Sequence, residues 1–216
     1  MSVVSRRWWW AWLCAALALI FLLQGLLVVI GWSEVADQRV NALVAGTWQP
    51  TIGLYCKFWA LLGGIEATTL LAIGLFVYLR RQGFKREAWA LLAFPLAILL
   101  ESLYRHFVAQ PPPPNAHGDG WSLAMLLPGH ERANTFPSGH MLRTVLIYGL
   151  LAFVVARLAP ASRLRQTITP LVGILVIVMA ASRLYLAVHW QSDVVGGAAL
   201  GGTALVAAIM WMERPG

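Results

Sequence analysis

The chain has 216 residues, of which 59% are hydrophobic and only 12% are charged, and its mean hydropathy is +0.70. The charged fraction is about half that of an ordinary soluble domain, which excludes a soluble globular protein. The 19 glycines and 11 prolines are scattered, so the composition fits neither a fibrous repeat nor a disordered chain. The remaining class is an integral membrane protein that crosses the bilayer several times.

The net charge is +7, from 16 Lys and Arg against nine Asp and Glu. In a membrane protein such a basic excess usually orients the loops, and the chain has no nucleic-acid-binding motif, so we expect no nucleic-acid partner. Cys14 and Cys56 lack metal-ligand spacing and are predicted to be packing residues.

Six stretches are apolar enough to span a bilayer, since a spanning helix needs about 20 mostly apolar residues. The first, residues 8–30, is framed by tryptophans of the kind found at membrane interfaces. It exceeds the roughly 7 to 15 residues of a signal-peptide core, so we expect it to be retained. The predicted spans are residues 8–30, 58–79, 88–107, 141–158, 168–188 and 194–212.

We therefore predict an all-α fold: an integral membrane six-helix bundle that forms a single domain over residues 1–216. With six spans both termini lie on one side, and the loops of that side hold ten of the 16 basic residues. These ten are Arg6, Arg7, Arg80, Arg81, Lys85, Arg86, Arg157, Arg163, Arg165 and Arg214. The positive-inside rule then places both termini in the cytoplasm. In the last span, Gly197 and Gly201 have a spacing that lets a neighbouring helix approach closely.

This orientation brings a set of ionisable residues near the span ends to the external face. They are Glu101, Arg105, His140, Arg143, Arg183, His189 and Asp193. Such residues in or beside spans are costly and usually functional. Residues 110–137 join the third and fourth spans on the same face without a helix or strand pattern, which favours an active-site loop.

Pro137, Ser138, Gly139 and His140 open the fourth span. A helix N-terminus offers free backbone N–H groups and a positive dipole end, which together bind phosphate. Ser138 would add its hydroxyl, and Gly139 would let the backbone come close to the ligand. Ser138 is also a favoured N-cap residue, so a purely structural role stays open for it.

Ser182 and Arg183, followed by His189 and Asp193, form a second cluster. Helical residues four apart share a face, so the Asp193 carboxylate can accept a proton from one imidazole nitrogen of His189 and leave the other nucleophilic. Arg183 offers a planar fork of donors to a phosphoryl group. The structural alternatives are a capping role for Asp193, an interfacial role for His189 and a snorkelling Arg183.

The two clusters resemble signature motifs of a known family. Phe-Pro-Ser-Gly-His, followed downstream by Ser-Arg, five residues, His, three residues and Asp, is similar to the second and third motifs of the type 2 phosphatidic acid phosphatase superfamily. That family includes membrane lipid-phosphate phosphatases, undecaprenyl diphosphate phosphatases, lipid A phosphatases, glucose-6-phosphatase and the vanadium haloperoxidases. Six spans with the motifs facing outward agree with its bacterial membrane branch.

The resemblance implies that His189 attacks phosphorus to form a phosphohistidine, that Asp193 orients His189, and that His140 protonates the leaving oxygen. The groups that would hold the phosphoryl oxygens are Ser138, the Gly139 amide and Arg183. Water then hydrolyses the intermediate. Neither a metal nor another cofactor is expected, because these groups supply the charge that magnesium supplies elsewhere.

The family's first motif, Lys, six residues and Arg-Pro, is incomplete. The best register puts Arg105 at the Lys position and Pro112 at the Arg position, so one basic group is kept and one is lost. Arg105 also follows Glu101 by four residues, which predicts a partly buried ion pair as an equal alternative to phosphate binding. The candidates to replace the lost charge are Arg132 and Arg143.

We therefore expect a metal-independent lipid phosphatase in the bacterial inner membrane, with its site facing the periplasm. Its substrate should be an amphiphile with phosphate at headgroup level: undecaprenyl diphosphate, phosphatidate or phosphatidylglycerophosphate. Two alternatives stay open. One is a phosphotransferase that passes phosphate from a polyprenyl diphosphate to another lipid such as lipid A. The other is a non-catalytic lipid-binding or transport relative, to which Pro112 points.

Overall fold

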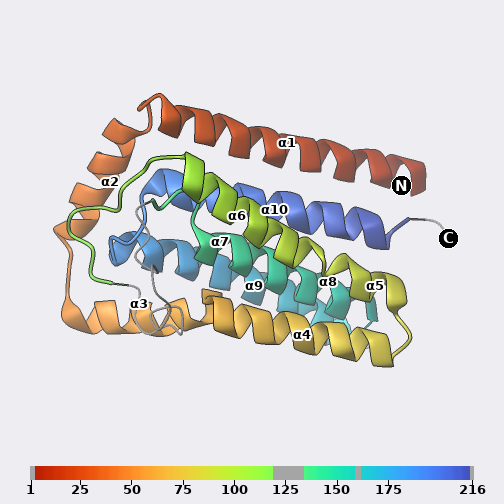
Figure 1. Cartoon of the computed structure of the whole chain (residues 1–216). Helices are drawn as coiled ribbons and strands as arrows, with labels where there is room; N and C mark the ends of the chain where they lie inside the picture. Colours follow the sequence, from red (N-terminus) through yellow and green to blue (C-terminus); the bar gives the residue numbers. More distant parts are fainter. Residues whose placement is uncertain (1–2, 119–133, 159–161, 215–216) are drawn as a thin grey trace.

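The computed structural model describes residues 3–118, 134–158 and 162–214, and within these ranges the regular structure is entirely helical. Figure 1 shows the long helices running side by side in a bundle. Six helical stretches of the described chain are long and apolar enough to cross a membrane. The predicted all-α membrane fold is confirmed.

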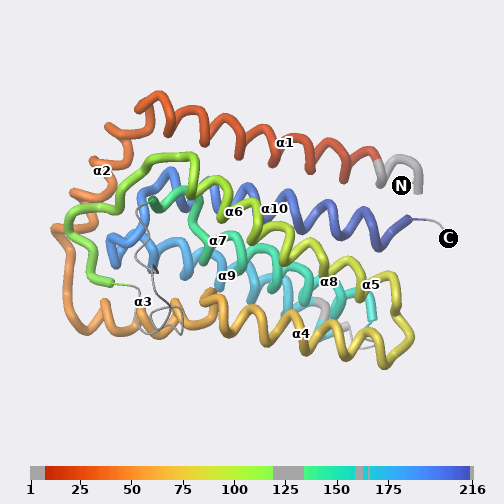
Figure 2. Tube along the Cα trace, viewed as in Figure 1, coloured from red at the N-terminus to blue at the C-terminus, as the bar shows by residue number. Residues whose placement is uncertain are grey.

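The six stretches correspond to more than six helices because several are interrupted. The first, fifth and sixth are α1 (Val3–Val29), α9 (Ser162–Tyr185) and α10 (Gln191–Met212). The second comprises α3 (Pro50–Gly63) and α4 (Ile65–Arg81), and the third α5 (Lys85–Ala90) and α6 (Ala93–Phe107). The fourth runs through α7 (Gly139–Arg143), a π-helical turn (Thr144–Tyr148) and α8 (Gly149–Leu158). The path of the chain through them can be followed in Figure 2.

The second span breaks at Gly64, whose backbone is extended between α3 and α4. A break inside a bilayer frees carbonyl groups that need donors. The fourth span supplies them: the Tyr148 hydroxyl donates to the Leu62 carbonyl over 2.9 Å, and Arg143 Nε donates to the Gly63 carbonyl over 3.1 Å. This stretch starts at Pro50, eight residues before the predicted start at residue 58, and proline suits a first helical position.

The helix α2 (Glu34–Ala45) is an element that the sequence analysis did not predict. Its 12 residues include charged side chains and are too few to span a bilayer. In Figure 1 it crosses one end of the bundle and joins α1 to α3, whereas α1 begins and α10 ends at the opposite end. Asp37 is the one residue of α2 whose side chain is buried, and it points to the neighbouring start of α10.

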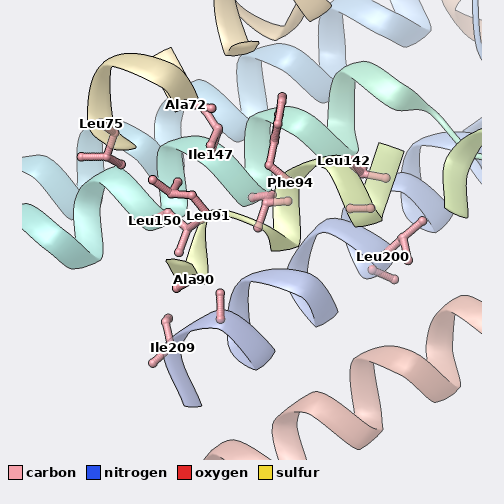
Figure 3. Close-up of a cluster of buried hydrophobic side chains, with 14 of the residues drawn as sticks. Ala72, Leu75, Ala90, Leu91, Phe94, Leu142, Ile147, Leu150, Leu200 and Ile209 are labelled. Atoms are coloured by element: carbon pink, nitrogen blue, oxygen red, sulfur yellow. The ribbon is translucent and has the colours of Figure 1, made fainter. Parts of the chain in front are cut away.

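The most buried of the six spans is α10, and its glycines allow the close packing that their spacing predicted. A Cβ atom on Gly197 would overlap the Ser138 carbonyl oxygen, and one on Gly201 would lie 2.5 Å from the Leu142 carbonyl oxygen. The backbone of the second motif therefore rests directly on α10. Away from the site, an apolar core including Leu91, Phe94, Leu142, Leu150, Leu200 and Ile209 joins α10 to α5, α6, α7 and α8 (Figure 3).

Candidate active site

The two motifs meet at the end of the bundle that α2 crosses. The Ser138 backbone N–H donates to the Asp193 carbonyl oxygen over 3.0 Å, although the residues are 55 positions apart. Ser138 stands at the N-cap of α7, but its hydroxyl makes no capping bond. The side chain is fully buried, and its Oγ finds no hydrogen-bond partner within the described ranges. An unsatisfied buried hydroxyl costs about 1–3 kcal/mol, and this hydroxyl does not serve as a helix cap.

The second motif is held in place by a buried cluster of charges. The Glu101 carboxylate accepts a hydrogen bond from Arg143 Nη1 over 3.1 Å and forms an ion pair with Arg105, whose Nε lies 3.1 Å from Oε1. Arg105 Nη2 donates to the Pro137 carbonyl oxygen over 3.0 Å. A Cβ atom on Gly139 would overlap the Glu101 carboxylate and would lie 2.6 Å from Arg143 Nη1, so only glycine fits at that position.

The ion pair between Glu101 and Arg105, predicted as one of two alternatives for Arg105, is thus present. Arg143 is buried, and its guanidinium binds both Glu101 and the Gly63 carbonyl, which ties the second motif to the break in the second span. Arg132 lies outside the described residues. Pro112 is exposed in a stretch without regular structure.

His189 and Asp193 form the pair that their spacing predicted. Nδ1 of His189 lies 3.2 Å from Oδ2 of Asp193, and both side chains are buried. The same oxygen accepts from the Trp190 N–H over 2.9 Å, so Asp193 also caps α10 as the structural alternative held. A carboxylate beside Nδ1 favours the imidazole tautomer that carries its proton on Nδ1. We assign this tautomer to His189 from its Asp193 partner, and it leaves the lone pair of Nε2 available.

A tight turn links Arg183, near the end of α9, to His189. The N–H of Val188 donates to the Arg183 carbonyl over 3.3 Å, and Ala187 adopts the left-handed region with φ of 50°. The Arg183 side chain is fully buried, and its Nε lies 3.4 Å from the Ser182 hydroxyl. His140, in the first turn of α7, lies within electrostatic range of Arg183 and His189. The structure thus brings the predicted histidines, aspartate and arginine together.

Asp37, which contacts the start of α10, was not among the predicted site residues. Its carboxylate accepts from the Ser192 N–H over 2.8 Å and from the Ser192 hydroxyl over 2.6 Å. Burial, followed by the negative charge of Asp193, raises the pKa of Asp37, and the hydrogen bonds from Ser192 oppose that rise. No sequence pattern could have identified the residue, because the two partners are 155 positions apart.

Within the described ranges no group of three or more His, Cys, Asp or Glu side chains is arranged to hold a metal ion. The residues assembled here are an arginine, a buried hydroxyl, a glycine amide and two histidines, of which His189 pairs with the Asp193 carboxylate. Such a set can bind a phosphoryl group and transfer it to an imidazole.

A model of the PAP2 superfamily matches residues 86–216, a range that includes both motifs. The chain belongs to the PAP2 superfamily. This confirms the family that the two motifs resembled. Phosphatidylglycerophosphatase B of Bacillus subtilis (strain 168) is 25% identical over 195 residues, which cover 86% of this chain and 88% of that protein. The family and this relative support the predicted class of enzyme, a lipid phosphatase.

Two solved structures have the same fold. A transmembrane PAP2-type phosphatidylglycerolphosphate phosphatase from Bacillus subtilis superposes with a TM-score of 0.74 at 22% identity, over 92% of this chain and 94% of that one. LpxE of Aquifex aeolicus superposes with a TM-score of 0.58 at 21% identity, over 81% of this chain and 94% of that one. At these identities the likeness establishes the fold of the membrane bundle.

Proposed function

We propose that this PAP2 protein hydrolyses the terminal phosphate of a membrane lipid through a phosphohistidine at His189. The observation that carries the proposal is the buried contact between His189 Nδ1 and Asp193 Oδ2. The buried Arg183 and His189 both lie within electrostatic range of His140. Phosphatidylglycerophosphate is the leading substrate, because the relative named for it aligns over 86% of this chain. Phosphatidate and undecaprenyl diphosphate are the other candidates.

The reaction proceeds in two steps. In the first, Nε2 of His189 attacks phosphorus, the bond from phosphorus to the lipid oxygen breaks, and His140 gives that oxygen a proton. Asp193 stabilises the positive charge that the His189 ring acquires. In the second step, His140 takes a proton from water, the oxygen of that water attacks phosphorus, and the bond to Nε2 breaks.

The transferring phosphoryl group carries its negative charge on three oxygens that need fixed donors. The Arg183 guanidinium, the Ser138 hydroxyl and the Gly139 N–H supply them. Because Arg183 and the backbone of Ser138 and Gly139 are held by buried contacts before substrate arrives, little reorganisation is needed as the transition state forms. In this proposal Arg105 and Arg143 act through Glu101: they fix Gly139 and the Pro137 carbonyl, and so hold the donors in place.

The site faces the periplasm in this proposal, and the protein lies in the bacterial inner membrane. The support is the distribution of charge. Arg80 and Arg81 end α4, Lys85 begins α5 and Arg214 follows α10, all on the side of the termini and opposite to the site, and such basic residues are retained in the cytoplasm. Lipid phosphate in the outer leaflet would then reach His189 at headgroup depth.

The test is release of inorganic phosphate by purified protein in detergent with a chelator present. Each candidate lipid is offered separately to the wild type, to His189→Ala and to His106→Ala, which removes an exposed histidine from α6. We expect release by the wild type and by His106→Ala, and none by His189→Ala. Equal release by His189→Ala, or no release from any of these lipids by folded wild type, would overturn the proposal.

A further inference from the structure

The start of α10 is held by groups from two other parts of the chain. Asp37 from α2 accepts both hydrogen bonds of Ser192, and Gln110 Nε2 donates to the Ser192 hydroxyl over 2.9 Å. All three side chains are more than nine-tenths buried. Ser192 directly precedes Asp193, so this network acts on the helical turn that carries the partner of His189.

Gln110 extends the network to the other half of the site. Its carbonyl oxygen accepts from the Thr135 N–H over 2.8 Å and from the Thr135 hydroxyl over 3.1 Å. Thr135 lies three positions before Ser138. The network therefore joins α2, the segment after α6, the residue that directly precedes the second motif and the start of α10 in one hydrogen-bonded unit.

Asp37 differs from an ordinary helix-capping residue in two respects. It comes from a separate helix, and it adds a second buried carboxylate to a helix start that already carries Asp193. Two carboxylates at one site repel each other unless a positive charge compensates them. Asp37 and His189 border the same small gap between α2 and the turn before α10. When the His189 imidazole is phosphorylated it becomes positively charged, and in this position its charge compensates the two carboxylates.

We propose that Asp37 is a positioning residue of the active site: through Ser192 it fixes the first turn of α10, so that Asp193 holds the His189 ring for attack. This inference rests on the proposed phosphohistidine chemistry. Asp37 does not touch the substrate in this scheme. Its loss should therefore lower the rate of the chemical step and leave substrate binding almost unchanged.

The matched variants are Asp37→Asn and Glu34→Gln. Both remove one negative charge from α2 and keep nearly the same side-chain shape. Unlike Asp37, Glu34 is exposed, and its carboxylate accepts a hydrogen bond from Gln38 within the same helix. We expect kcat to fall about 10- to 100-fold in Asp37→Asn, because small misplacements of reacting groups have effects of that size. KM should stay within about twofold, and Glu34→Gln should match the wild type in both constants.

Ser192→Ala provides a second route to the same contact. It removes the hydroxyl but keeps the backbone N–H, so its kcat should fall less than that of Asp37→Asn. Because both residues act through one contact, the double variant should be no slower than Asp37→Asn alone. Additive losses in the double variant would contradict the proposed path through Ser192.

The closing experiment reads the His189 ring directly. In protein with ¹⁵N-labelled histidine, His189 of the wild type should give the shifts of a ring protonated at Nδ1 alone, and Asp37→Asn should give a mixture of tautomers. Melting temperature and gel filtration identify any variant that does not fold, and Ser192→Ala then takes its place. Wild-type kcat together with an unchanged tautomer in Asp37→Asn would overturn the inference. A wild type that releases no phosphate would overturn the proposed function instead, and the tautomer measurement would still decide the positioning role.

Discussion

The substitution Glu101→Gln tests the buried charge cluster that supports the second motif. Glu101 lies between two arginines, at 3.1 Å from each, and the exposed fractions of the three side chains are 4% for Glu101, 12% for Arg105 and 3% for Arg143. Glutamine has nearly the same shape as glutamate but no charge. The variant would therefore remove the buried negative charge that the two guanidinium groups share.

The expected loss follows from that arrangement. Removing one partner of a buried ion pair costs about 3–5 kcal/mol, chiefly because the remaining charge is left uncompensated. For a chain of this length each kcal/mol corresponds to about 2–4 °C in melting temperature, so the variant should melt roughly 6–20 °C below the wild type. Phosphate release should also fall, since Gly139 packs directly on the Glu101 carboxylate.

Thermal melting in detergent, followed by the loss of monodisperse protein after heating, measures the effect. Glu87→Gln is the matched control: Glu87 pairs with Arg157 over 3.4 Å, but the arginine side chain is 41% exposed. In Glu87→Gln the charge that remains, on Arg157, is in contact with water, so the loss should be close to the roughly 1 kcal/mol or less of an exposed pair and the control should melt within about 4 °C of the wild type. Equal melting temperatures for Glu101→Gln and the wild type would refute the buried-cluster argument.

Three further predictions follow from the site and its packing. Asp193→Asn should lower kcat by about 10³-fold or more, because an amide beside Nδ1 no longer selects the nucleophilic tautomer; a loss below tenfold in phosphate release at saturating lipid would contradict the assigned role. Gly197→Ala should lower both melting temperature and activity, since the new Cβ would overlap a backbone carbonyl oxygen of the second motif, whereas Gly173→Ala, with open space around it, should melt at or slightly above the wild-type temperature. The raised pKa of Asp37 means that its ionised form is less favourable in the folded than in the unfolded chain, so its contribution to stability is fully present below the ordinary pKa of 3.8 and is lost as pH rises through the raised value. The melting temperature of the wild type minus that of Asp37→Asn should therefore increase as pH is lowered from about 7 to about 4, and a difference independent of pH would argue against this linkage.

The sequence predicted the spans because hydropathy over about 20 residues directly reflects the cost of backbone and side chains in a bilayer. It did not reveal α2, since a short polar helix at an interface has no comparable apolar signature. The break at Gly64 was missed although two adjacent glycines precede Ile65, because a single unpaired turn hardly changes the mean hydropathy of the span.

The site shows the same division between local and distant information. The contact of His189 with Asp193 could be predicted because residues four apart share one helical face. The bonds of Arg143 to Glu101 and of Asp37 to Ser192 depend on which helices pack together, and they join positions 42 and 155 apart. The long-range part of the active site therefore became visible only in the folded bundle.

The central claim is that His189 carries the phosphoryl group, and trapping that intermediate tests it most directly. Protein mixed with phosphatidylglycerophosphate is quenched in alkali, where phosphohistidine is stable, and its peptides are weighed by mass spectrometry. We expect a phosphate adduct on His189 in the wild type, more of it when hydrolysis is slowed, and no adduct in the His189→Ala variant. Steady phosphate release by the wild type with no adduct on His189, or with the adduct on another residue, would contradict the account.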